Sequence, residues 1–202
     1  MVKLFIEGGG DHNPALASEL RQAFSVFLSK AGFDSRKPRI VACGGRDSAF
    51  KDFCTACNNN ENAMLLVDSE DPVTASGSIE HLQTRDNWSF PGSVNDSRCG
   101  LMVTCMESWF FADIETFSAY FGNDFKKNNF PKNSSSIEIR NRKSVLKILE
   151  NASKDTKKGQ YSKGRDSFKI LMRIDPKKVA GKSRWAKIFL ENLDTLLQKE
   201  FS

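Results

Sequence analysis

The chain has 202 residues, of which 39% are hydrophobic and 16 are Phe, and its formal net charge is +5. This composition supports one substantial core, with room for a small appendage, and excludes a long array of domains. No apolar run approaches the roughly 20 residues that a membrane span needs, and no apolar signal core follows Met1. Five cysteines, an odd number, fit a reducing compartment better than a disulfide framework. We therefore expect a soluble, cytoplasmic protein without membrane association.

The positive charge is concentrated in one part of the chain. Residues 1–139 hold 13 Lys and Arg against 18 Asp and Glu, whereas residues 140–187 hold 16 against 4. An acidic first part joined to a basic second part suggests a cation site in the former and a polyanion-binding surface in the latter. The alternative for the second part is a solvated, Lys-rich helical face.

The first elements alternate between strand and helix. Residues 2–6 are a continuous apolar stretch typical of a short strand, and the three glycines at residues 8–10 favour a tight turn. Asn13 followed by Pro14 predicts a helix start, because Asn caps helices and Pro is favoured at the first helical position. Apolar residues then recur at three- and four-residue spacing as far as Gly32, where we expect the helix to end.

The alternation continues along the chain. Further strands are predicted at residues 39–43, 63–67 and 101–105, and helices at residues 47–57 and 107–121, with a helix or loop at about 76–82. This order indicates an α/β fold in which a compact, mainly parallel sheet lies between helices.

The pattern changes after Gly122. Residues 123–136 are polar and predict a linker, whereas helical periodicity dominates from Glu138 onward and is interrupted at Pro176. We therefore expect an α/β domain at residues 1–135 and a basic α-helical annex at residues 136–202 that packs on it.

Three apolar runs end on carboxylates. Glu7 follows the first predicted strand, Asp68 and Glu70 follow the third, and Glu107 follows the fourth. The carboxyl ends of parallel strands share one edge of a sheet, so these acids should converge. Asp11 adds a further carboxylate after the glycine turn. Hard cations such as Mg²⁺ prefer a few carboxylates plus water, so the sequence predicts a metal site at this edge.

Two residues of this edge have competing interpretations. Glu107 is either a further ligand, or a group that orients metal-bound water, or the capping carboxylate of the next helix. Arg46, which follows two glycines after the second strand, either clamps a phosphate or pairs with Asp47 or Glu70.

The basic annex contains the segment KKGQYSKGR, which mixes cations with an aromatic residue. Such a composition suits contacts to backbone phosphates, with Tyr161 stacking on a base. A charge run that is merely solvated is the alternative. The candidate nucleic-acid contacts in the annex are Lys157, Lys158, Tyr161, Lys163, Arg165, Lys177, Lys178 and Lys182.

Several other chemistries lack their motifs. Gly181-Lys182-Ser183 is not a P-loop, because Pro176 stands where the first glycine belongs. The pair Cys54 and Cys57 has no second pair at metal spacing, and no G-x-S-x-G elbow is present.

The glutamate after the first strand and the D-x-E of Asp68 and Glu70 resemble the TOPRIM domain shared by topoisomerases, primases and OLD-family nucleases. The blocks CGGRDSAF, LLVDSEDP, CMESWFFAD and KGQYSKGRDSFKILMRIDPKKV, in this order, are similar to a prokaryotic family of small TOPRIM-like proteins of unassigned function. Members of that family often occur beside an ABC-type ATPase in phage-defence loci.

The resemblance implies a three-layer fold, bound Mg²⁺ or Mn²⁺ and phosphodiester chemistry. By motif position, Glu7 would be a general acid/base or metal ligand, and Asp68 and Glu70 would hold the metal. Asp11 and Glu107 would assist. Glu70 stands where the TOPRIM pattern has a second Asp, which keeps the charge but lengthens the side chain.

These observations lead to one main hypothesis and two rivals. The main hypothesis is a metal-dependent nuclease, acting on DNA or RNA, that serves as the effector of an antiphage system with an ATPase partner. One rival is a noncatalytic TOPRIM-like module that binds nucleic acid or a partner protein. The other is a phosphatase in which Asp68 is the nucleophile.

Overall fold

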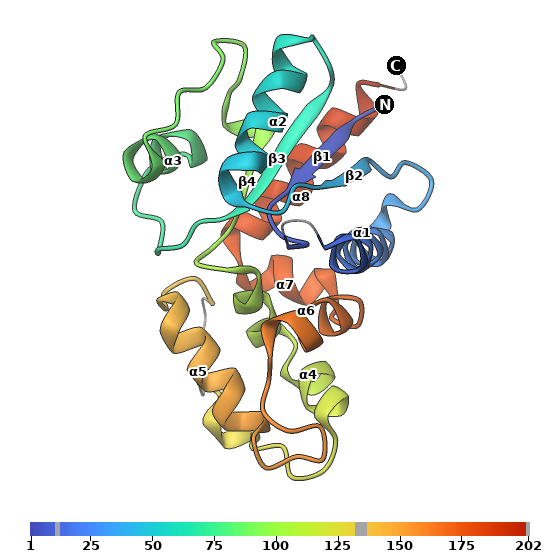
Figure 1. Cartoon of the computed structure of the whole chain (residues 1–202), viewed down its shortest axis with the longest axis vertical. Coiled ribbons are helices and arrows are strands. Elements are labelled where there is room, and N and C mark those ends of the chain that lie inside the picture. The colour runs from blue at the N-terminus through green and yellow to red at the C-terminus, as the bar shows by residue number, and fades with distance from the viewer. Residues whose placement is uncertain (11–12, 132–136, 201–202) are drawn as a thin grey trace.

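Four parallel strands form the sheet at the centre of the computed structural model, which describes residues 1–10, 13–131 and 137–200 (Figure 1). The strands are β1 (Lys3–Ile6), β2 (Arg39–Ala42), β3 (Ala63–Asp68) and β4 (Cys99–Met102). Their order across the sheet is β2-β1-β3-β4, and every neighbouring pair is parallel. The chain therefore extends the sheet first on one side of β1 and then on the other.

Helices cover both faces of the sheet. Leu4 and Ile6 of β1 pack in a cluster with α1 (Pro14–Leu28) and α8 (Arg184–Gln198), whereas Phe5 packs in a second cluster with α2 (Arg46–Asn58) and α3 (Ser78–Asp86). Successive side chains of a strand point to opposite faces, so continuous apolarity means burial on both. The predicted α/β class, with a parallel sheet between helices, is confirmed.

The remaining elements lie mostly beyond one end of the sheet. Figure 1 shows α4 (Ile114–Phe121), α5 (Arg142–Ser153) and α6 (Lys163–Leu171) in the lower part of the view and the sheet in the upper part. Among the described residues, no helix combines the length and apolarity needed to cross a bilayer. The other elements outside the sheet and its covering helices are the π-helix η1 (Ser29–Phe33), the 3₁₀ helices η2 (Asp96–Arg98), η3 (Met106–Ala112) and η4 (Lys127–Asn129), and the α-helix α7 (Pro176–Lys182).

The first turn and helix agree with the sequence. The three glycines at residues 8–10 have φ values of 120°, 89° and 67°, a region that residues with a β-carbon rarely adopt. Asn13 caps α1 by accepting a hydrogen bond from the Leu16 amide at 3.0 Å, and Pro14 is the first helical residue.

Three predicted elements differ in the structure. The fourth strand lies at Cys99–Met102 rather than at residues 101–105, because Thr104 adopts a left-handed φ of 49° that a strand cannot accommodate. The helix predicted at residues 107–121 is divided into η3 and α4 by the non-helical backbone of Asp113. Pro176 lies between α6 and α8, as predicted, but it begins the additional short helix α7 there, because a proline at the first position loses no helical hydrogen bond.

The last helix contributes to the core of the sheet. A β-carbon at Gly100 of β4 would lie 2.7 Å from Cδ2 of Phe189 in α8, so only glycine allows this close packing. Val2 donates a backbone hydrogen bond to Glu200 at 2.9 Å, which brings the two ends of the described chain together. The domain boundary near residue 135 stays a prediction, but α8 lies against the strands of the first part.

Candidate metal centre

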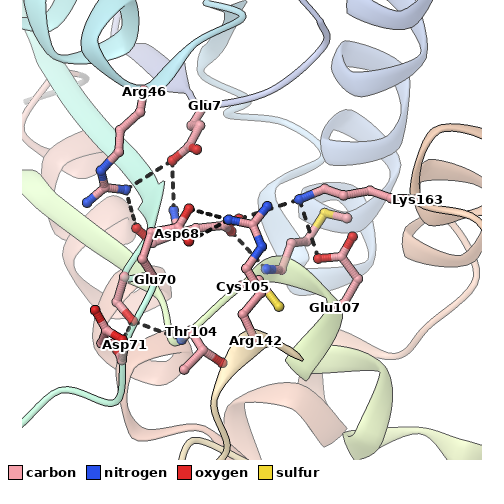
Figure 2. Close-up of polar contacts among 12 residues, drawn as sticks. Glu7, Arg46, Asp68, Glu70, Asp71, Thr104, Cys105, Glu107, Arg142 and Lys163 are labelled. Carbon is pink, nitrogen blue, oxygen red and sulfur yellow. Dashed lines mark hydrogen bonds and ion pairs between the residues drawn. The ribbon is translucent and has the colours of Figure 1, made fainter. Parts of the chain in front are cut away.

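Three carboxylates meet at the carboxyl edge of β1 and β3. Ile6 pairs with Leu66 in the parallel register, so Glu7 and Asp68 leave adjacent strands at nearly the same level. One carboxylate oxygen from each of Glu7, Asp68 and Glu70 lies within 4.8 Å of the other two (Figure 2). The acids that lie 61 or more positions from Glu7 in sequence are thus brought together by the order of the strands.

The backbone after β3 turns back toward this edge. Glu70 has a left-handed φ of 65°, and its amide donates to the Thr104 carbonyl at 3.0 Å. Ser69 fixes the same segment, because its hydroxyl accepts the Thr104 amide at 2.8 Å and its own amide donates to the Met102 carbonyl at 2.9 Å. This turn keeps Glu70 beside Asp68 instead of letting it continue along the strand direction.

Asp68 is the most buried of the three acids. Its side chain is 5% exposed, its Oδ1 accepts the Met106 amide at 2.8 Å, and its own amide donates to Oε2 of Glu7 at 3.2 Å. Burial, opposed by the Lys163 ammonium and reinforced by the charges of Glu7 and Glu107, raises the pKa of Asp68 to about 7. Burial also raises the pKa of Glu7, although the Arg46 guanidinium works in the opposite direction.

Three cationic side chains face the acidic edge. Arg46 pairs with Glu7 at 3.1 Å, and Arg142, the first residue of α5, pairs with Glu70. Lys163, the first residue of α6, places Nζ 3.6 Å from Oδ2 of Asp68. Figure 2 shows that Arg142 and Lys163 approach from the side opposite Arg46. The helices after residue 140 therefore supply part of this centre.

Glu107 lies next to the three acids but deeper in the molecule. It is fully buried in η3, and its Oε1 accepts a hydrogen bond from the Tyr161 hydroxyl at 3.1 Å. Its Oε2 faces Nζ of Lys163 at 3.6 Å. Lys163 thus links Glu107 to Asp68, because its ammonium faces both carboxylates.

The donor set suits a hard divalent cation. Carboxylate oxygens are the protein ligands that Mg²⁺ prefers, and Mn²⁺ accepts the same ligands. Ligand oxygens on one Mg²⁺ are at most about 4.2 Å apart, since each lies about 2.1 Å from the ion. Adjacent ligands on an octahedral ion are only about 3 Å apart, so the oxygens of Glu7, Asp68 and Glu70, which lie within 4.8 Å of one another, would move closer together on binding an ion. Asp11, the fourth predicted ligand, lies outside the described residues.

Arg46 has different partners from those the sequence suggested. It pairs with Glu7 and, at 2.7 Å, with Asp86, and its guanidinium lies 4.9 Å from the centre of the Trp88 ring. Neither Asp47 nor Glu70 is its partner in these contacts, because α3 brings Asp86 to the site from 40 positions away.

Of the predicted nucleic-acid contacts, one is buried and another is directed toward the acidic edge. Tyr161 is buried and bonded to Glu107, so the expectation that it stacks on a base is wrong. An aromatic ring enclosed in the core cannot present a face to a ligand. The Lys163 side chain is 45% exposed, but its ammonium faces Asp68 and Glu107 at the acidic edge.

The other basic residues are exposed. Lys158 lies over the Tyr120 ring, with Nζ 5.1 Å from its centre; Arg165 pairs with Asp166 at 2.8 Å, and Lys178 pairs with Asp113 at 2.6 Å. These residues are accessible, and their binding to a polyanion stays a prediction. The remaining three candidates are Lys157, Lys177 and Lys182, which are all exposed.

Sequence reasoning missed Arg142 and Asp86. Arg142 is one of 16 basic residues between positions 140 and 187, and no local pattern distinguishes it from the others. The nearest signal is Asn141, which caps α5 by accepting the Ser144 amide at 2.9 Å and so fixes where the helix begins. Asp86 ends α3, where an acid is usually a solvated surface residue.

A parallel sheet with a cluster of acids at its carboxyl edge defines an α/β protein with a candidate divalent-metal centre. Comparison with known families shows a match over residues 6–194 to the family described as a domain of unknown function, DUF4276. The chain belongs to this family. Neither a curated protein nor a solved structure matches the chain.

Proposed function

We propose that this protein is a metal-dependent phosphodiesterase that hydrolyses DNA or RNA with Mg²⁺ or Mn²⁺ at Glu7, Asp68 and Glu70. The observation that carries the proposal is the convergence of their oxygens to within 4.8 Å at the carboxyl edge of a parallel sheet. Ligands bind at this edge in open α/β folds, and β1 is the strand from which the chain order departs in both directions.

The residues of the centre suit hydrolysis of a phosphodiester. A bound divalent ion supplies water activation and charge neutralisation at the leaving oxygen. Burial raises the pKa of Glu7 above the usual value of a glutamate, the direction that favours a role in proton transfer. Arg142 and Lys163 bring positive charge to the same edge, where a phosphate group would need it. The exposed lysines of the annex would hold the rest of the strand electrostatically.

One observation favours a noncatalytic alternative. Glu7, Asp68 and Glu70 each already face a protein cation, namely Arg46, Lys163 and Arg142. An acidic cluster neutralised in this way could serve structure alone, and the basic annex could then bind nucleic acid or a partner protein. This alternative predicts binding that a chelator does not affect, together with no turnover.

The biological setting of the proposal comes from the sequence resemblance. The resemblance to TOPRIM-like proteins encoded beside ABC-type ATPases supports a role as the effector of an antiphage defence system. In that role an ATPase partner would restrain or position the phosphodiesterase. Co-purification of this chain with a co-expressed ATPase from the same locus would test the partnership.

The activity is tested by cleavage of single- and double-stranded DNA and RNA with Mg²⁺ or Mn²⁺, with and without chelator. We expect cleavage by the wild type and loss of cleavage in Glu7→Gln and Asp68→Asn. Asp71→Asn is the matched control, because Asp71 follows the same strand but is 67% exposed, and Arg85 is its one ion-pair partner in the part of the chain that the structure describes. Equal activity in all four proteins would refute the assigned site. Trapping of phosphate on Asp68, with release of inorganic phosphate from small phosphoesters, would favour a phosphatase instead.

A further inference from the structure

We infer that Lys163 takes the place of a second divalent ion in this centre, so that the protein binds one divalent cation and not two. The inference rests on the proposed function, because it assumes that the first ion binds at Glu7, Asp68 and Glu70. It extends that function by stating that the centre holds one ion and that Lys163 occupies the position of a second.

The position of the Lys163 ammonium is that of a bridging cation. Its Nζ is 3.6 Å from Oδ2 of Asp68 and 3.6 Å from Oε2 of Glu107. In two-metal phosphodiesterases the second ion lies about 3.5–4 Å from the first, so a carboxylate can contact both. Asp68 lies as such a shared carboxylate would, because it faces the site formed with Glu7 and Glu70 and also faces the Lys163 ammonium. Figure 2 shows Lys163 and Glu107 on one side of Asp68 and Glu7 on another.

Glu107 gives independent evidence that a cation belongs here. Its side chain is 0% exposed, and Oε2 makes no hydrogen bond within the described residues. A buried carboxylate oxygen without a hydrogen bond is costly unless a positive charge stands next to it. Lys163 supplies that charge, since its ammonium is directed at Oε2 from the start of α6.

The charges of the edge leave room for one divalent ion. Four carboxylates, those of Glu7, Asp68, Glu70 and Glu107, face three cations, those of Arg46, Arg142 and Lys163. Asp86 shares Arg46 and also pairs with Arg85, so including both leaves the same excess of one negative charge. One divalent ion turns this into an excess of one positive charge. A second would raise the excess to three and would lie against the lysine ammonium, which repels it.

The start of α6 holds Lys163 in place. The Asp166 carboxylate accepts the Ser162 amide at 2.9 Å and the Tyr120 hydroxyl at 2.9 Å, which fixes the residue that precedes Lys163. The ammonium is thereby held between the carboxylates of Asp68 and Glu107.

The inference is tested by counting bound Mn²⁺ by isothermal titration calorimetry and by electron paramagnetic resonance of free Mn²⁺. We expect one ion per chain in the wild type and two in Lys163→Met, because the variant vacates the position between Asp68 and Glu107. Adding Glu107→Gln to Lys163→Met should restore a count of one. Lys169→Met, a change at an exposed lysine of the same helix, should keep one ion.

The outcomes separate this inference from the proposed function. No bound ion in the wild type would overturn both. Two ions in the wild type would overturn only the role of Lys163, and so would a count of one in Lys163→Met. Glu107→Gln alone decides the matter if Lys163→Met does not fold. The count should stay at one, because Lys163 still occupies the position beside Asp68, and a count of zero would show that Glu107 is itself a ligand of the single ion and would overturn the role of Lys163.

Discussion

Asp68 should make the protein less stable as the pH rises, and the substitution Asp68→Asn should remove this effect. The pKa of the Asp68 carboxyl is raised from 3.8 to about 7 in the folded protein. Between these two values the folded state binds more protons than the unfolded state, so the free energy of unfolding falls with increasing pH. Each pKa unit corresponds to about 1.4 kcal/mol, so Asp68 destabilises the fold by about 3 kcal/mol more at about pH 8 than at about pH 4.5.

The prediction is measured by urea unfolding with chelator present. The amide of Asn at this position keeps an acceptor for the Met106 amide but cannot ionise. Other carboxyl groups also titrate in this range, so the relevant quantity is the stability of the variant minus that of the wild type. This difference should move in favour of the variant by about 3 kcal/mol between about pH 4.5 and pH 8.

Asp166→Asn is the control, because its pKa is shifted in the opposite direction. Burial opposes the shift, but hydrogen bonds from Arg165 and Ser162 outweigh it and lower the pKa of Asp166 below 3.8. Its stabilising effect is complete above that value, so the difference for this variant should stay flat over the same range. A flat difference for Asp68→Asn as well would refute the reasoning that burial governs the acid at the centre.

Two further predictions concern packing and the buried acid. Gly100→Ala should lower the free energy of unfolding by about 1–3 kcal/mol, because its β-carbon would lie 2.7 Å from Phe189; Gly92→Ala, which meets no atom within 4 Å, is the control in the same urea titration. Tyr161→Phe should cost about 1–3 kcal/mol in thermal or urea unfolding, since it leaves both oxygens of Glu107 without a hydrogen bond. Unchanged stability in Tyr161→Phe would contradict the burial of Glu107 described above.

Much of the fold was predictable because the relevant signals are local. Continuous apolar runs bounded by glycine and polar residues indicated four strands, and Asn13 with Pro14 indicated the start of α1. Boundaries were less predictable where backbone geometry overrides side-chain pattern. Thr104 and Asp113, whose conformations end β4 and separate η3 from α4, carry no sequence signal strong enough to reveal this.

The sequence by itself determined that acids follow the buried strands. The hydrophobic pattern indicates about where each strand ends, and the sequence shows which residue comes next. Tertiary structure decided which groups share the centre. The strand order places β1 beside β3, and the packing of α5 and α6 brings Arg142 and Lys163 to the acids from 72 and 95 positions beyond Glu70 and Asp68. Ion pairs of this kind depend on distances across the folded chain, and a local sequence pattern contains no information about those distances.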